Sequence, residues 1–141
     1  MVRRLTKKKA LEICSYLWAW LLNEVKKNPN DPTAGLKMSW PGWEIYGRMA
    51  YDCPCCEYVL QSVYPRRRPK GFVVMTPEAC RRHCPLYSLW EKAEEIGIPT
   101  CETPGTPYDN WVRHKTLGKD PAEAAQQIVN ACVKELEKLD A

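Results

Sequence analysis

Six of the eight cysteines fall between positions 53 and 101, and this grouping constrains the fold more than any other feature of the sequence. The segment "DCPCCEY" at 52–58 places Cys53 and Cys56 in a C-x2-C arrangement. In that spacing a tight turn can direct two thiolates at one ion, as in structural zinc knuckles, and Cys55 inside the turn is expected to point away. A thioredoxin-like dithiol has the same spacing, but no βαβ pattern surrounds this pair and further cysteines follow. The pattern therefore favours half of a metal site.

The other ligands of this site are expected from the segment 80–101. Cys84 precedes Pro85 at a predicted helix start, where the positive end of the helix dipole favours a thiolate. Cys101 follows the helix-stopping residues "GIP" at 97–99, so the chain can fold back towards Cys84. The neighbouring His83 is expected to take no part. The sequence predicts one structural zinc ion per chain with the ligands Cys53, Cys56, Cys84 and Cys101, and with Cys80 as the alternative fourth ligand. The absence of ferredoxin spacing favours zinc over an iron–sulfur cluster.

Two cysteines lie outside this group. Cys14 and Cys132 fall on the apolar faces of predicted helices, where a free cysteine behaves as a small hydrophobic residue. The apolar run from Ile13 to Leu22 is too short to span a bilayer, and no small-residue cleavage site follows it. We therefore expect a cytoplasmic protein of a bacterial host cell, whose reduced thiols bind metal rather than form disulfides.

Both ends of the chain predict long amphipathic helices. Over 7–27, after the capping residue Thr6, apolar residues recur at steps of three and four. Over 121–139 the same periodicity follows "DPAE" at 120–123, which has the form of a capping box. The last helix is expected to pack on the first helix or on a partner, through the face listed here: Ala125, Ile128, Cys132, Leu136 and Leu139.

The middle of the chain is expected to be loop-rich, because many of the twelve prolines interrupt it. Short helices are predicted to start at Thr76-Pro77, Cys84-Pro85 and Thr106-Pro107, since proline is favoured at the first helical position. A short strand is possible at 72–75. The sequence thus predicts a mainly α single domain over 1–141, with terminal amphipathic helices around a metal-binding centre at 53–111 and little strand.

Basic residues are unevenly placed, although the formal net charge is only +4. Such runs either form solvated surface or contact the phosphates of nucleic acid. The tryptophans of "KMSWPGWEIYG" at 37–47 are candidates for stacking on bases or for anchoring a protein partner. The candidate contact residues are Arg66, Arg67, Arg68, Lys70, Arg81, Arg82, Trp40 and Trp43.

Enzymatic activity is not expected. The chain has only two histidines, whereas catalytic zinc usually needs histidine or carboxylate ligands and a base. The zinc-deaminase signature, the P-loop and the dinucleotide-binding fingerprint are all missing from the sequence. A small metalloenzyme is the least favoured of the functions considered.

The arrangement of motifs from Cys53 to Trp111 resembles small cysteine-rich proteins of unknown function encoded by tailed phages and prophages. The shared features are C-P-x-C at 53–56, C-P-L-Y at 84–87, a later cysteine at 101 and P-Y-x2-W at 107–111. The chain departs from that pattern in having C-x3-C-P-L at 80–86, which leaves the role of Cys80 open. The resemblance implies a small metal-bound phage accessory protein without enzymatic activity.

Together these features predict a non-enzymatic, zinc-stabilised interaction module. In the context of a phage or mobile element, it would bind and modulate or inhibit a host protein or a defence complex. The alternative is a nucleic-acid-binding zinc module that uses the basic residues at 66–70 and 81–82.

Overall fold

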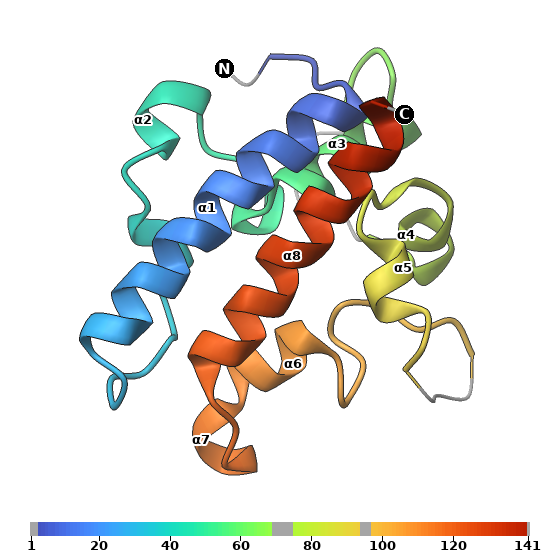
Figure 1. The fold of residues 1–141 in the computed structure, drawn as a ribbon. Coiled ribbons are helices and arrows are strands. Elements are labelled where there is room, and N and C mark those ends of the chain that lie inside the picture. Colours follow the sequence, from blue (N-terminus) through green and yellow to red (C-terminus); the bar gives the residue numbers. More distant parts are fainter. Residues whose placement is uncertain (1–2, 69–74, 94–96, 141) are drawn as a thin grey trace.

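The structure, a computed structural model, describes residues 3–68, 75–93 and 97–140, and every regular element in these ranges is a helix (Figure 1). This confirms the predicted mainly α fold. The possible strand at 72–75 falls almost wholly outside the described residues. The elements are α1 (Lys7–Lys27), η1 (Lys37–Ser39), α2 (Trp43–Tyr46), η2 (Ala50–Asp52), α3 (Pro54–Val63), α4 (Pro77–His83), α5 (Tyr87–Trp90), α6 (Pro107–Val112), α7 (His114–Leu117) and α8 (Pro121–Asp140).

Helices α1 and α8 form an antiparallel pair at the centre of the molecule (Figure 1). Lys8 near the start of α1 lies 3.1 Å from the carboxylate of Asp140 at the end of α8, which brings the two chain ends together. The last helix therefore packs on the first, as predicted. Their contact is made by buried residues of α1 (Ala10, Leu11, Ile13, Cys14, Leu17, Trp18, Leu21 and Val25) and of α8 (Ala124, Ala125, Ile128 and Cys132).

The buried face of α8 is shorter than the sequence predicts. Ile128 is 1% exposed and Cys132 is fully buried, but Leu136 is half-buried and Leu139 is 42% exposed.

Helices α3 and α6 close the core on either side of this pair, α3 against α1 and α6 against α8. Trp111 of α6 is 2% exposed and meets Trp18 of α1 edge to face, with ring centroids 5.0 Å apart. The hydroxyl of Thr33 donates a hydrogen bond of 2.9 Å to the carbonyl of Trp111, which fastens the loop after α1 to α6. The indoles therefore form part of the apolar core.

The predicted helix starts at Thr76 and Thr106 are confirmed. The Thr76 side-chain oxygen accepts a hydrogen bond from the Ala79 N–H, and that of Thr106 accepts one from the Asp109 N–H. The start at Cys84-Pro85 is wrong. Cys84 ends α4, with its N–H donating to the carbonyl of Cys80, and α5 begins only at Tyr87. Among the described residues, no helix has both the length and the apolar character that a membrane crossing requires.

Replacing Ile128 by Ala is expected to lower the free energy of unfolding by about 2–5 kcal/mol, because the methyl groups it loses leave a cavity between α1 and α8. Val133→Ala is the control, since Val133 lies on the same helix but is 45% exposed and should change stability little. Chemical denaturation of both variants measures the difference. Equal stability of the two variants would contradict the packing described for α8.

Candidate metal centre

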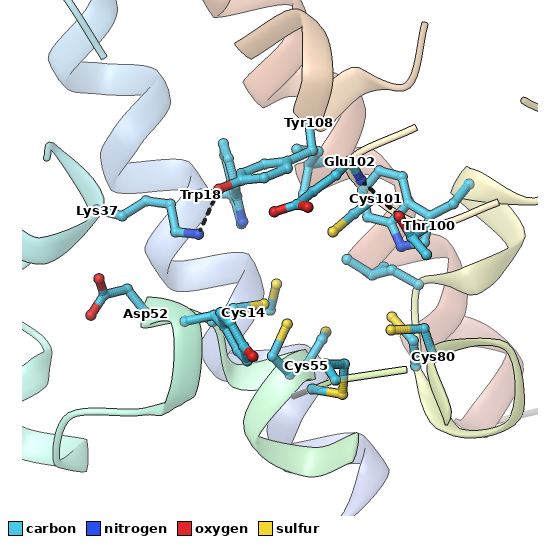
Figure 2. A pocket seen from close by; sticks show the side chains of 18 of the residues that line it. Cys14, Trp18, Lys37, Asp52, Cys55, Cys80, Thr100, Cys101, Glu102 and Tyr108 are labelled. Carbon is cyan, nitrogen blue, oxygen red and sulfur yellow. Dashed lines mark hydrogen bonds between the residues drawn. The ribbon is translucent and has the colours of Figure 1, made fainter. Parts of the chain in front are cut away.

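Seven cysteines line a single cavity of about 420 Å³ between α1, the start of α3, the end of α4 and the loop before α6 (Figure 2). They are Cys14, Cys53, Cys55, Cys56, Cys80, Cys84 and Cys101, and none is in a disulfide. The predicted ligands, including the alternative Cys80, are thus all brought to one place although they span 49 positions of sequence, from 53 to 101. Figure 2 shows Cys14 and Cys55 on one side of an open space, with Cys80 and Cys101 across from them.

The C-x2-C motif forms the beginning of a helix rather than a knuckle. Cys53 is the N-cap of α3 in an extended conformation, and Pro54 occupies the first helical position. The positive end of the α3 dipole therefore lies beside Cys53. The dipole argument that the sequence suggested for Cys84 applies to Cys53 instead, because Cys84 lies at the C-terminal end of α4.

The expectation that Cys55 points away from the site is wrong. In the first helical turn of α3 its side chain projects inward, is 2% exposed, and lies in hydrogen-bonding contact with the thiols of Cys14 and Cys53. Cys14, predicted as a core residue, is fully buried and also lines the cavity. Cys132 lies behind Cys14, with the two thiols hydrogen-bonded, and does not reach the cavity wall.

The residues just before Cys53 adopt an uncommon backbone conformation. Tyr51 and Asp52 have φ angles of 56° and 49°, in the left-handed region that non-glycine residues rarely enter. The arrangement is held by Arg48, which donates to the Asp52 carboxylate at 3.0 Å, and by the Ala50 N–H, which donates to Glu57 at 3.1 Å. This turn sets the direction in which the chain enters α3, and so the position of Cys53.

Cys80 and Cys84 reach the cavity together because residues four apart lie on the same side of a helix. Cys101 comes from the loop before α6. The Thr106 hydroxyl donates to the Cys101 carbonyl, and the Asp109 carboxylate accepts from the Gly105 N–H at 3.1 Å and from Arg113 at 2.6 and 2.7 Å. These contacts fix the loop that carries Cys101.

Two thiols of the group are predisposed to ionise. Hydrogen bonding with Cys132 lowers the pKa of Cys14 to about 6. Hydrogen bonds from Cys55 and Cys56 hold the pKa of Cys53 well below its ordinary value, and the nearby Lys37 adds to the effect. Burial disfavours the charged form of Lys37, but its pKa is raised because the charge of Cys53 and the contacts with Tyr108 outweigh that burial. Lys37 donates to the Tyr108 hydroxyl at 3.2 Å, and its Nζ lies 4.7 Å from the centre of that ring (Figure 2). A cationic amine therefore faces the thiols.

Three thiols of the cavity resist ionisation, those of Cys56, Cys80 and Cys101. Burial raises the pKa of Cys101, and burial raises the pKa of Cys80 to about 11. Hydrogen bonding to Cys53, together with burial, raises the pKa of Cys56. A metal that binds to these three cysteines must displace their protons.

The cysteines do not converge on one point. Among the residues that the structure describes, no group of three or more histidine, cysteine, aspartate or glutamate side chains is gathered closely enough to hold a single metal ion. Four thiolates on one zinc ion, each at about 2.3 Å, would bring their sulfurs to about 3.8 Å from one another. The thiols surround the cavity instead, and the zinc ion stays a prediction.

Arginines predicted as contact residues line a second hollow, which we call the arginine groove. Arg66 and Arg68 lie there with Arg4, Arg48, Ala50, Glu57, Gln61 and Tyr64. Arg67 is exposed beside the groove but does not line it. Arg81 and Arg82 lie elsewhere, on α4, where both pair with Glu78. Lys70 lies outside the described residues.

The two tryptophans predicted as contacts are not available to a partner. Trp40 and Trp43 are 8% and 7% exposed, pack edge to face at 5.0 Å, and Trp40 stacks on Tyr46. They belong to the same apolar core as the buried residues of α1. The exposed apolar residues of the same segment are Met38 and Ile45, at 54% and 78%.

Sequence patterns do not single out Glu57, Lys37 or Arg4 as functional residues. Glu57 is 1% exposed, accepts from the Ala50 N–H and from Gln61 at 3.1 Å each, and forms an ion pair with Arg68. An acidic residue in the first turn of a helix is usually expected to be exposed and to interact favourably with the helix dipole. Only the tertiary structure shows that this carboxylate is buried beneath the arginine groove.

Replacing Arg68 by Ala is expected to lower the free energy of unfolding by about 1–3 kcal/mol, because it leaves the buried Glu57 carboxylate without its cation. Arg67→Ala removes the same charge from the next residue, which is exposed, and should leave stability unchanged. Denaturant titration compares the two variants. Equal effects of the two substitutions would contradict a stabilising role for the buried ion pair.

The arrangement that distinguishes this protein is a cavity walled by thiols from four parts of the chain, beside a groove walled by arginines. Comparison of the chain with protein-family models, with curated proteins and with solved structures gave no match. The chemistry of the site is therefore inferred from its own residues.

Proposed function

We propose that the protein is a non-enzymatic interaction module whose fold depends on a metal centre held by cysteine thiolates. The observation that carries the proposal is the convergence of seven cysteines on one cavity. Buried thiols that served only as packing would be expected to be scattered through the core, as free cysteine behaves like a small hydrophobic residue. Their gathering around shared space is what thiolate ligation of a metal requires.

The way α4 is attached supports a structural role for the metal. None of the residues of α4 is fully buried, so the helix contributes little apolar surface to the core. Its cysteines nevertheless face those at the start of α3 across the cavity. Metal ligation would join α4 and the Cys101 loop to the central helices and supply stability that apolar packing does not.

The ligand set favours a structural centre over a catalytic one. No histidine of the described residues lines the cavity, and the acidic residues there are Asp52 and Glu102. All-thiolate sites are characteristically closed, whereas catalytic sites keep an open position with mixed ligands.

A host protein, or a protein of a host defence complex, is the proposed partner. The resemblance to phage-encoded cysteine-rich proteins suggests this class, and the exposed Met38 and Ile45 offer apolar contact area within one segment of the chain. In this proposal the buried Trp40 and Trp43 hold the segment against the core and do not contact the partner.

Nucleic acid is the second candidate, favoured by the arginine groove. Four arginines from three segments of the chain line this hollow, and Arg66 is exposed and forms no ion pair with the described residues. Arginine is well suited to phosphate because its planar guanidinium donates in pairs.

Removing the metal with a chelator under reducing conditions is expected to expose α4 and the Cys101 loop first. Hydrogen exchange should rise in residues 75–90 and 97–106, while the α1–α8 pair keeps most of its protection because its apolar contacts do not involve the metal. Mass-spectrometric hydrogen exchange measures this. Protein that holds no metal when prepared anaerobically, and that exchanges identically with and without chelator, would refute the proposal.

The partner is tested by capture from host lysate on the immobilised protein, with and without nuclease. We expect a captured protein that resists nuclease, is lost with Ile45→Ser, and is retained with Val133→Ser, which changes an exposed apolar residue on α8. Direct binding of the purified captured protein to both variants confirms the contact.

The same capture distinguishes the second candidate. Binding that is sensitive to nuclease, falls steeply with salt, and is weakened by Arg66→Ala but not by the neighbouring Arg67→Ala would identify nucleic acid in the arginine groove. The two variants remove the same charge, so the comparison separates a contact in the groove from a general effect of net charge.

A further inference from the structure

The cavity is too large for the single ion that the sequence predicts. Its volume is about 420 Å³, which is on the order of ten times the ~30 Å³ that one water molecule occupies in the liquid. A single zinc ion draws its four sulfurs into contact and leaves no space between them. Here the sulfurs stand around open space (Figure 2), and no three potential ligands among the described residues meet at one point.

We propose that this cavity binds an iron–sulfur cluster, with Cys53, Cys56, Cys84 and Cys101 as its thiolate ligands. The inference rests on the proposed thiolate metal centre and specifies its occupant. In a cubane cluster each of the four cysteines binds a different iron, so the ligand sulfurs surround an inorganic core instead of meeting at one ion. That requirement matches thiols distributed around a cavity.

The ligands are chosen because they approach from three separate directions. Cys53 and Cys56 come from the start of α3, Cys84 from the end of α4, and Cys101 from the loop before α6. All of them are half-buried rather than sealed, which leaves a path for iron and sulfide from solvent. Cys14 and Cys55 are fully buried and form the floor of the cavity.

The surroundings suit an anionic cluster. The Lys37 amine reaches into the cavity beside Cys53 and is held by Tyr108, so a positive charge lies next to the ligand sulfurs. Trp18, Leu86, Trp90 and Ile128 supply apolar walls that limit water. On assembly, each ligating thiol gives up its proton as its sulfur bonds to iron, and inorganic sulfide bridges the irons.

The spacing argument for zinc does not oppose this assignment. The ferredoxin spacings place several ligands in one short run of sequence. In this chain the ligands are distributed over three elements, and their proximity arises from packing rather than from spacing. The C-x2-C pair is common to both kinds of site.

The test uses the full chain, produced in iron-supplemented cells, purified without oxygen, and analysed for iron, zinc, copper and acid-labile sulfide. We expect equal amounts of iron and sulfide, about four of each per chain for a cubane cluster. We also expect a brown protein whose broad visible absorption bleaches on reduction with dithionite. Reconstitution of the metal-free protein with ferric iron, sulfide and excess dithiothreitol, which reduces part of the iron, should restore the same spectrum.

The outcomes separate the cluster from the metal centre as such. One zinc per chain without sulfide, or iron or copper without sulfide, would overturn the cluster and leave the thiolate metal centre standing. No metal in the purified protein and none taken up on reconstitution would overturn both.

Variants assign the ligands. Cys56→Ser and Cys84→Ser are expected to lose most of the bound iron and sulfide, whereas Cys132→Ala should retain them, since Cys132 touches the thiol network but does not line the cavity. Cys80→Ser should retain the cluster if Cys84 is the ligand from α4. Should a serine variant fail to fold, the wild-type iron and sulfide content still decides the proposal. Full retention of the cluster in both Cys56→Ser and Cys84→Ser would refute the ligand assignment.

Discussion

The gathering of thiols around one cavity is the constraint on which the middle of this protein depends. The start of α3, the end of α4 and the loop before α6 are short, and α4 has no fully buried residue. Segments of that kind cannot bury enough apolar surface to offset the entropy lost on ordering them. They meet where their cysteines meet. A bound metal centre is the physical means by which such a region would acquire a fixed arrangement.

The terminal helices supply the buried apolar surface that the short cysteine-bearing segments lack. The α1–α8 pair buries two long apolar faces and carries Cys14 at the floor of the cavity, while Trp18 extends from α1 to both Trp111 and Tyr108 of α6. The long helical pair thus forms one wall of the cavity, and the shorter segments, α4 and the Cys101 loop, form other walls. This division explains why metal removal should act on α4 and the Cys101 loop before it acts on the helical pair.

Helix α3 connects the two hollows of the molecule. Its first turn directs Cys55 and Cys56 to the cavity, while Glu57 turns the other way and lies beneath the arginine groove. Glu57 also holds the Ala50 N–H in the turn that sets Cys53. A substitution of Arg68, or a molecule bound in the arginine groove, would therefore affect the cysteine cavity through the Glu57 carboxylate and the turn before Cys53.

The sequence by itself determined the long terminal helices, the short helix starts at Thr76 and Thr106, and the cysteines at 53–101 as one site, because helical periodicity, capping and ligand type are local properties. It could not show that Cys14 and Cys55 join that site, that Trp40 and Trp43 are buried, or that Arg4 and Arg48 meet Arg66 and Arg68. These depend on which way each helix faces after packing. The size of the cavity was decided only by tertiary structure, since sequence spacing fixes distances within a turn but not across three elements.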